Sequence, residues 1–379
     1  DLTYEADLDH TPKYFNERLS ALMDDSIRLH LRADVPVGSY LSGGVDSTLV
    51  AILASRHDAA NTNAFHGRFT DYPGYDESAY AREAARASGK TLHEMTITAR
   101  DFTDSIEKVI YHLDQPAAGP GSFPQYMVSG LAAQHNKVVL GGQGGDEIFA
   151  GYARYLVAYF EQCLKAAIDG TYKDGHFVVT AETIIPNLES LREYKPMLAS
   201  FWKEGLFESH DRRYFRLINR FADLAGEISP DLLDQEQAWS DFREVFNNTE
   251  NVHNRAYLDQ MLHFDSKTLL PALLHVEDRM SMAHGLESRV PFLDHPVIEF
   301  LATVPASVKF RHGKLKTMLK EVFSDVLPTQ IVQRRDKMGF PVPLNEWYGK
   351  EISHFVNDLF LSRAARERSI FVPNALSGA

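Results

Sequence analysis

One short segment, residues 42–47, combines glycines, hydroxyls and an acid in the manner of a site that holds a bulky anion. Between a stretch that predicts a strand (35–41) and a predicted helix (51–56), it reads Ser42-Gly43-Gly44-Val45-Asp46-Ser47. A strand–loop–helix unit directs backbone N–H groups and the positive end of a helix toward one point. Glycines let the backbone approach the anion, and hydroxyls donate further hydrogen bonds. We therefore interpret this segment as an anion-binding loop rather than a plain turn.

Asp46 indicates that a metal ion accompanies the anion. No lysine follows the two glycines, so the loop differs from the Gly-x-x-x-x-Gly-Lys-[Ser/Thr] phosphate loop. A carboxylate repels phosphate, but it is a common ligand of Mg²⁺, which in turn binds phosphate oxygens. The loop therefore predicts a Mg²⁺–phosphate site with Asp46 as a metal ligand.

A second glycine-rich turn follows a short apolar stretch, residues 137–140, that also predicts a strand. The turn reads Gly141-Gly142-Gln143-Gly144-Gly145-Asp146-Glu147. Four glycines remove side chains, which leaves room for a flat ring or a ribose against the backbone. Asp146 is either the cap of the next helix or a second Mg²⁺ ligand, and its similarity to Asp46 favours the ligand.

Two later segments concentrate charge. Residues 277–294 carry many charged side chains among apolar ones, as expected either for a substrate site or for a salt-bridge network that includes Arg289 and Asp294. Lys337 precedes a Gly/Pro turn, from which it is placed to cover a phosphate as a movable point charge. The basic stretch 309–337 around it is either a solvated helix face or the anion-facing wall of a nucleotide site.

The order of predicted elements brings the two glycine turns together. Strands and helices alternate from residue 35 to about residue 160, which predicts a mainly parallel sheet with helices on both faces. Ligands of such sheets bind beyond the C-terminal ends of the strands, where both turns lie. After residue 152 helical patterns dominate, and a strand signal appears at 176–180. The other predicted strands are 63–69 and 92–98, and the other predicted helices are 14–31, 75–89, 101–113 and 124–135.

Composition narrows the functional classes. The 379 residues carry a net charge of −13, which argues against a nucleic-acid-binding surface. A single cysteine, Cys163, excludes an internal disulfide framework and fits a cytoplasmic protein. No apolar run approaches the roughly 20 residues of a membrane span. The acidic start at Asp1 looks like a linker or a boundary rather than a natural beginning.

Together these segments resemble the asparagine synthetase family, in its C-terminal ATP-pyrophosphatase synthetase domain. The segment 42–47 alone is shared with the wider N-type ATP pyrophosphatases, whereas 75–82 and 278–294 are much more specific. The resemblance implies an α/β fold of the adenine nucleotide alpha hydrolase-like type, followed by a largely helical part. It divides the chain into a linker and helix (1–34), an ATP-pyrophosphatase core (35–160) and a mainly helical remainder (161–379) that completes the site.

The resemblance also implies a reaction. ATP is cleaved between its α and β phosphates to adenylate the side-chain carboxylate of aspartate, and ammonia then displaces AMP to give asparagine. ATP, Mg²⁺ and small-molecule substrates are the expected partners, with neither nucleic acid nor membrane, and a homodimer is left open. The expected binders of ATP and pyrophosphate are Leu41, Ser42, Gly43, Gly44, Asp46, Ser47, Gly67, Gly141 and Gly142. Asp46 and Asp146 hold Mg²⁺, the substrate binders are Glu277, Asp278 and Glu287, and the catalytic residues are Lys337, Gln143 and Glu147.

Three departures from the family pattern keep alternatives open. Gln143 stands where asparagine-forming members carry an acid, and a glutamine side chain cannot accept a proton from the incoming amine. Either Glu147 or another base takes this role, or the acceptor is not free aspartate. Gly67 replaces a larger apolar residue. The N-terminal glutaminase domain is expected to be absent, so ammonia comes from solvent or from a missing segment. The alternatives are an amidotransferase acting on another carboxylate, an RNA-modifying ATP pyrophosphatase, and a nucleotide-binding module without catalysis.

Overall fold

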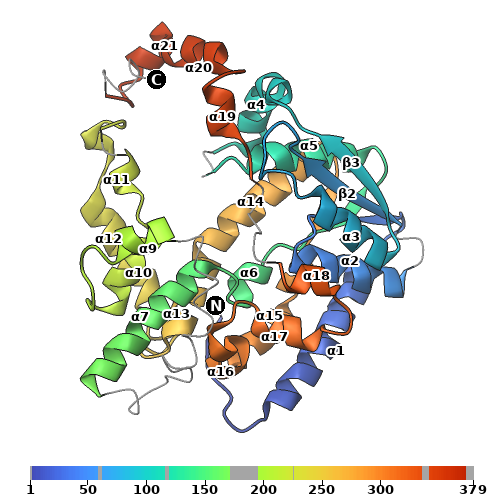
Figure 1. Ribbon diagram of the computed structural model, residues 1–379, viewed down its shortest axis with the longest axis vertical. Coiled ribbons are helices and arrows are strands. Elements are labelled where there is room, and N and C mark those ends of the chain that lie inside the picture. Colours follow the sequence, from blue (N-terminus) through green and yellow to red (C-terminus); the bar gives the residue numbers. More distant parts are fainter. Residues whose placement is uncertain are drawn as a thin grey trace.

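The chain folds around a parallel five-stranded sheet (Figure 1). The structure, a computed structural model, describes residues 2–58, 62–115, 119–170, 195–224, 226–334 and 341–372. The strand order is β3-β2-β1-β4-β5, and every neighbouring pair is parallel. The strands are β1 (Val37–Tyr40), β2 (Asn63–Arg68), β3 (Thr91–Thr96), β4 (Val138–Leu140) and β5 (Glu287–Arg289). The predicted α/β fold is therefore confirmed.

Helices cover both faces of this sheet, as a parallel sheet requires. On one face α1, α2 and α3 pack in succession, and on the other α5 lies against β2 with α4 and α14 beside it. These helices are α1 (Pro12–His30), α2 (Val45–His57), α3 (Ser78–Ser88), α4 (Ala99–Leu113), α5 (Ser122–Ala133) and α14 (Leu269–Met282). The sheet and its helices thus form a three-layer core.

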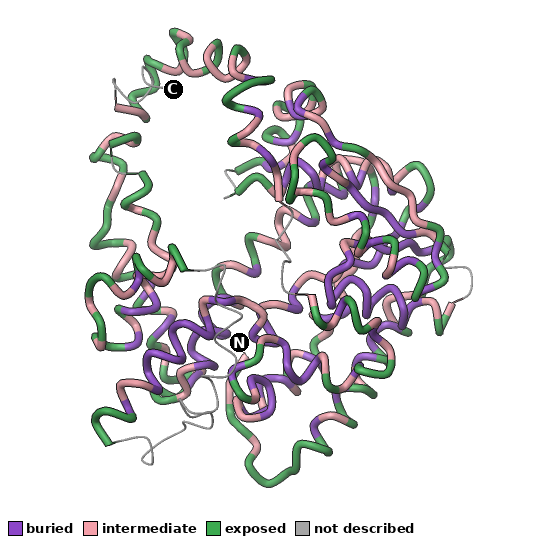
Figure 2. The backbone as a smooth tube through the Cα atoms, viewed as in Figure 1, coloured by how far each residue is buried: buried purple, intermediate pink, exposed green. Residues whose placement is uncertain are grey.

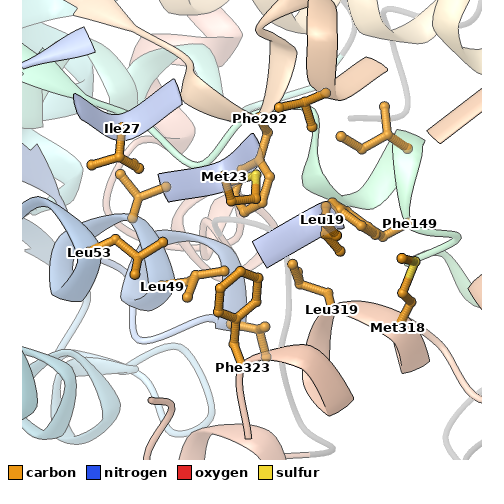
Figure 3. Close-up of a cluster of buried hydrophobic side chains, with 14 of the residues drawn as sticks. Leu19, Met23, Ile27, Leu49, Leu53, Phe149, Phe292, Met318, Leu319 and Phe323 are labelled. Carbon is orange, nitrogen blue, oxygen red and sulfur yellow. The ribbon is translucent and has the colours of Figure 1, made fainter. Parts of the chain in front are cut away.

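Local sequence signals explain where these helices begin and which face they bury. Thr11 caps α1 by accepting a hydrogen bond from the Tyr14 backbone N–H, and a proline occupies the first turn. Thr98 and Asp101 form a reciprocal capping box at the start of α4. The buried side chains of α1 recur every four residues at Phe15, Leu19, Met23 and Ile27. They meet Leu49 and Leu53 of α2 and Phe292 in one apolar cluster (Figure 3).

The remaining helices form a second buried region and then return to the core. Buried backbone gathers both around the sheet and around α7 and α13 (Figure 2), where an aromatic-rich cluster lies. This region comprises α6 (Gly145–Ile148), α7 (Ala153–Asp169), α9 (Lys195–Phe201), α10 (His210–Ile218), α11 (Phe221–Leu224), η2 (Pro230–Leu232), α12 (Gln235–Phe246) and α13 (Tyr257–Lys267). After β5 come η3 (Pro291–Leu293), α15 (His295–Thr303), α16 (Ala306–Lys309), η4 (Arg311–Gly313), α17 (Thr317–Val322), α18 (Thr329–Val332), α19 (Leu344–Tyr348), α20 (Ser353–Phe360) and α21 (Arg363–Glu367). No helix within the described ranges is long and apolar enough to cross a bilayer.

Strand β5 was not predicted, because three residues containing two charges give no strand pattern. It extends the sheet from within the mainly helical part, with Arg289 opposite Leu140 of β4. Arg289 forms an ion pair, as the salt-bridge interpretation expects of it, but its partner is Glu287 at 2.7 Å. The Arg289 guanidinium also donates to the backbone carbonyls of His30, the last residue of α1, and of Arg32, two residues further on. The strand predicted at 176–180 lies outside the described residues.

A fully buried ion pair anchors the second region. Arg213 of α10 donates to both carboxylate oxygens of Glu161 on α7, at 2.6 and 2.8 Å, and neither side chain is exposed. Arg213 also donates to the Glu204 and Phe201 carbonyls, and Trp202 donates to Glu161. The pair therefore joins three helices through satisfied hydrogen bonds.

Arg213→Met is expected to lower the free energy of unfolding by about 3–5 kcal/mol, because it strands the Glu161 carboxylate in a dry environment. Urea unfolding followed by far-UV circular dichroism measures the change. Arg216→Met is the matched control, since this half-exposed arginine forms ion pairs with the exposed acids Glu204 and Glu208, and its loss is expected to cost about 1 kcal/mol or less. Equal losses in both variants would show that burial of the pair does not matter.

Candidate active site

The two glycine turns meet because β1 and β4 are neighbours in the sheet. Ser39 pairs with Leu140, so both strands end at the same level and both turns leave the same edge. A Cβ atom on Gly142 would lie 2.9 Å from the Ser47 backbone nitrogen and 3.1 Å from Asp46 Cβ. Only a residue without a side chain permits this approach. The expectation that both turns face one pocket is confirmed.

A cavity of about 320 Å³ opens at this edge. Both turns contribute to its wall, with α5 and α14 opposite them. The predicted site residues that line it are Leu41, Ser42, Asp46, Ser47, Gly67, Gly141, Gly142, Gln143, Asp146 and Glu277. The cavity size and its place beyond the strand ends are those of a small-molecule site in a parallel α/β sheet.

Hydrogen bonds and close packing fix the conformation of the first turn. The Ser42 backbone N–H donates to Ser47 Oγ at 3.2 Å, and the Gly44 N–H donates to Ser42 Oγ at 3.3 Å. Gly43 adopts a φ of +70°, and a Cβ there would lie 2.4 Å from the Tyr80 carbonyl carbon. Gly44 precedes the 13-residue helix α2, whose N-terminus points its free N–H groups at the turn. Gly43 and Gly44 thus shape the loop without lining the cavity.

Lys316 joins the two predicted metal ligands. Its Nζ lies 2.5 Å from Asp46 Oδ2 and 2.6 Å from Asp146 Oδ1, and the side chain is buried. Burial lowers the pKa of Lys316, but the two carboxylates outweigh this effect and raise the pKa above its ordinary value. Lys316 has a φ of +55°, which is uncommon for a residue with a side chain and marks a position fixed by its surroundings.

The carboxylate pair suits Mg²⁺ as well as an ammonium group. Asp46 and Asp146 already share one cation, the Lys316 Nζ, and their oxygens are the ligands that Mg²⁺ prefers. Glycines make space around both carboxylates. A Cβ on Gly145 would lie 2.7 Å from Asp46 Cγ, and one on Gly151 would lie 1.9 Å from Asp146 Oδ1. The residues present therefore fit a metal ion bound between protein and phosphate.

Gln143 and Glu277 face each other across the cavity wall. Gln143 Nε2 donates to Glu277 Oε2 at 3.2 Å, and Ser288 Oγ donates to Oε1 at 2.5 Å. Burial raises the pKa of Glu277, and these two hydrogen bonds oppose that rise. A Cβ on Gly141 would lie 3.0 Å from Glu277 Oε1, so the second turn packs directly on this carboxylate.

Apolar side chains also line the cavity. Phe65, Phe69 and Val128 line it beside Gly67. A Cβ on Gly67 would lie 2.7 Å from Val128 Cγ2 and 2.8 Å from Ile97 Cδ1, so these two side chains fill the space of the larger residue that the family pattern has there. Such a surface suits a flat ring such as adenine.

Comparisons with known proteins agree with this geometry. The sequence model of the asparagine synthase family matches residues 18–378. The chain belongs to the asparagine synthase family. It is 30% identical to asparagine synthetase [glutamine-hydrolyzing] 1 of Bacillus subtilis (strain 168), over 88% of this chain and 51% of that protein. It is 25% identical to asparagine synthetase [glutamine-hydrolyzing] 3 of the same organism, over 89% and 50%, and 24% identical to the amidase chyE of Penicillium rubens, over 95% and 57%. The chain thus spans about half the length of the curated relatives it matches.

Not every residue expected from the asparagine synthase pattern reaches the cavity. Asp278 and Glu287 are exposed and do not line it, and Glu287 instead contacts Arg289 at 2.7 Å. Glu147 is buried beneath the cavity wall and accepts a hydrogen bond from the Tyr152 hydroxyl. Lys337 lies outside the described residues. Of the three predicted substrate binders, Glu277 alone lines the cavity.

Two basic residues of the site were not predicted individually. Lys316 was only part of the basic stretch 309–337, and its ammonium group contacts Asp46 and Asp146 rather than lining the cavity. Arg334 pairs with Glu77, stacks over the Tyr80 ring at 3.9 Å, and approaches the Gly43 carbonyl. Arg334 therefore connects the basic stretch 309–337 to the first glycine turn.

Proposed function

We propose that the protein is an ATP-dependent amide-forming ligase that adenylates a carboxylate and then transfers an amine to it. The observation that carries this proposal is that the serine- and glycine-rich first turn, the carboxylates of Asp46 and Asp146 (both in contact with Lys316) and an apolar surface meet at one cavity. This arrangement matches an ATP molecule whose adenine and phosphates occupy opposite ends.

The chain's own residues have distinct parts in this scheme. The backbone N–H groups after Gly43 and the hydroxyls of Ser42 and Ser47 bind the pyrophosphate portion of ATP. Asp46 and Asp146 hold Mg²⁺, which neutralises charge on the phosphates. Lys316, next to both acids, stabilises the negative charge that moves onto the departing pyrophosphate. Lys337 stays a proposed contributor to the same charge stabilisation.

Aspartate is the first acceptor to test, because two relatives that match 88% and 89% of this chain are named asparagine synthetases. A second acceptor class is favoured by the cavity itself. Among the described residues that line it, none is lysine or arginine, whereas a free amino acid brings an α-carboxylate that pairs best with a cation. A carboxylate on a molecule without that second acidic group fits this lining as well. The proposed amine is ammonia, because these two relatives are named as glutamine-hydrolyzing enzymes.

Acceptor-dependent turnover tests the proposal. The chain is incubated with Mg-ATP, ammonium and either aspartate or another carboxylate from a panel, and the products are identified by mass spectrometry. We expect amide and AMP to form with one acceptor and not in its absence. Turnover of ATP that no carboxylate stimulates would contradict an amide-forming ligase.

A further inference from the structure

Amide formation from an adenylate requires a base, and position 143 does not supply one. The attacking nitrogen is neutral ammonia, and after the C–N bond forms it carries a positive charge until a proton leaves. The Gln143 side chain has no site that accepts this proton at neutral pH. Another proton acceptor therefore takes this role.

The charge partners of the cavity acids distinguish one of these acids from the other three. Four acids within the described lining are Asp46, Glu77, Asp146 and Glu277. Asp46 and Asp146 share the Lys316 ammonium group, and Glu77 pairs with Arg334. The hydrogen-bond donors on Glu277 are Gln143 and Ser288, which are both neutral. A carboxylate with neutral donors keeps more of its basicity than one held by a cation.

The position of Glu277 also suits this role. Its carboxylate lies against Gly141, while the neighbouring Gly142 lies against Asp46 and Ser47. Consecutive glycines of the second turn thus contact Glu277 through Gly141 and the first turn through Gly142. Because Glu277, Asp46 and Ser47 line the same cavity, an adenylate formed beside the first turn shares that cavity with the Glu277 carboxylate.

We propose that Glu277 is the general base of the amide-forming step and that Gln143 is the residue that positions it. This inference rests on the proposed function. Ammonia attacks the acyl carbon of the adenylate, and the C–N bond forms. Glu277 takes one proton from the nitrogen, the C–O bond to the phosphate breaks, and AMP leaves with that electron pair. Glu277 then returns the proton to solvent, so one adenylate and one ammonia yield one amide, AMP and a proton.

A base with a raised pKa predicts a defined pH dependence. Burial raises the pKa of Glu277, so its carboxylate protonates at a higher pH than an exposed glutamate. The titratable group that faces Glu277 from β1 is Tyr40. Burial and the nearby Glu277 raise the pKa of Tyr40 and keep it neutral, and its hydroxyl forms hydrogen bonds with Ser129 and Gln125 of α5. From β5 it meets Ser288, whose neighbours Glu287 and Arg289 pair with each other. The amide-forming step is therefore expected to slow as pH falls through the pKa of Glu277.

The experiment separates the two half-reactions. Acceptor-dependent exchange of labelled pyrophosphate into ATP, without amine, reports adenylation, and amide production with ammonium reports the second step. Glu277→Gln is expected to keep exchange within about twofold and to lower amide production about 10²-fold or more. Glu299→Gln, an exposed acid of α15, is the control and is expected to change neither.

The exchanged pair Gln143→Glu/Glu277→Gln tests base function against a structural role. This double change moves the acid from position 277 to position 143. We expect its amide production to be at least tenfold higher than that of Glu277→Gln alone. Because position 143 is only half-buried, the acidic limb of the pH profile is expected to shift to lower pH. Unchanged amide production in Glu277→Gln, parallel loss of exchange, or no recovery in the exchanged pair would each overturn the proposal. Absence of exchange in the unaltered chain would instead refute the proposed function.

Discussion

Asp46→Asn is expected to lower acceptor-dependent pyrophosphate exchange by about 10³-fold while leaving the fold intact. Asparagine has the same size and preserves the packing beneath the first turn, but it removes the negative charge that faces Lys316. It also removes one of the two proposed Mg²⁺ ligands. Loss of a preorganised charge at a reacting phosphate is worth about 10²–10³-fold or more in rate. Exchange kinetics measure the effect, and thermal unfolding verifies the fold.

The matched control for this change is Asp25→Asn. Asp25 is exposed on α1 and contacts Arg28 one turn away, so the same chemical change occurs far from the cavity. We expect unchanged exchange in this variant. Exchange in Asp46→Asn within tenfold of the control would remove Asp46 from the proposed metal site and, with it, the mechanism proposed for the first turn.

Lys316→Met is expected to reduce exchange by a similar factor, about 10³-fold, and to make the nucleotide-free chain respond to Mg²⁺. Without the ammonium group, Asp46 and Asp146 face each other as two carboxylates, and a divalent cation relieves their repulsion. Addition of Mg²⁺ is therefore expected to raise the melting temperature of this variant more than that of the unaltered chain. Differential scanning calorimetry measures this shift independently of catalysis.

Two further variants define the role of Lys316. Lys314→Met removes an exposed lysine two residues away, and we expect neither exchange nor the Mg²⁺ response to change. Lys316→Arg keeps the charge but enlarges the side chain. Gly151 packs closely on Lys316, since a Cβ atom on Gly151 would lie 2.4 Å from Lys316 Cε. We therefore expect little recovery of exchange. Full activity in Lys316→Met would mean that the lysine only balances charge in the folded state.

Local sequence signals predicted the sheet core and both glycine turns. The strands at 63–69 and 92–98 agree with β2 and β3 to within two residues, because each is a short apolar or alternating run with clear boundaries. The turns were recognised because glycines, hydroxyls and acids cluster within six or seven consecutive residues. Such signals are complete within one stretch of chain.

The contacts that were missed join residues far apart in sequence. Lys316 and Asp46 are 270 positions apart in the sequence, and the residues next to Lys316 give no signal that its side chain is buried. Gln143 and Glu277 are separated by 134 positions, so the departure at 143 was visible while its partner was not. Strand β5 exists only because β4 offers its free edge to three residues that carry no strand pattern. Tertiary packing, rather than local propensity, decides all three.

The most direct test of the account is the identity of the nucleotide products. Phosphorus NMR of Mg-ATP turned over with ammonium and an active carboxylate distinguishes cleavage between the α and β phosphates from cleavage at the terminal phosphate. The proposed adenylation predicts AMP and pyrophosphate in equal amounts, matched by amide. ADP and inorganic phosphate as the products would contradict it, because the carboxylate would then be activated by phosphorylation and not by transfer of AMP.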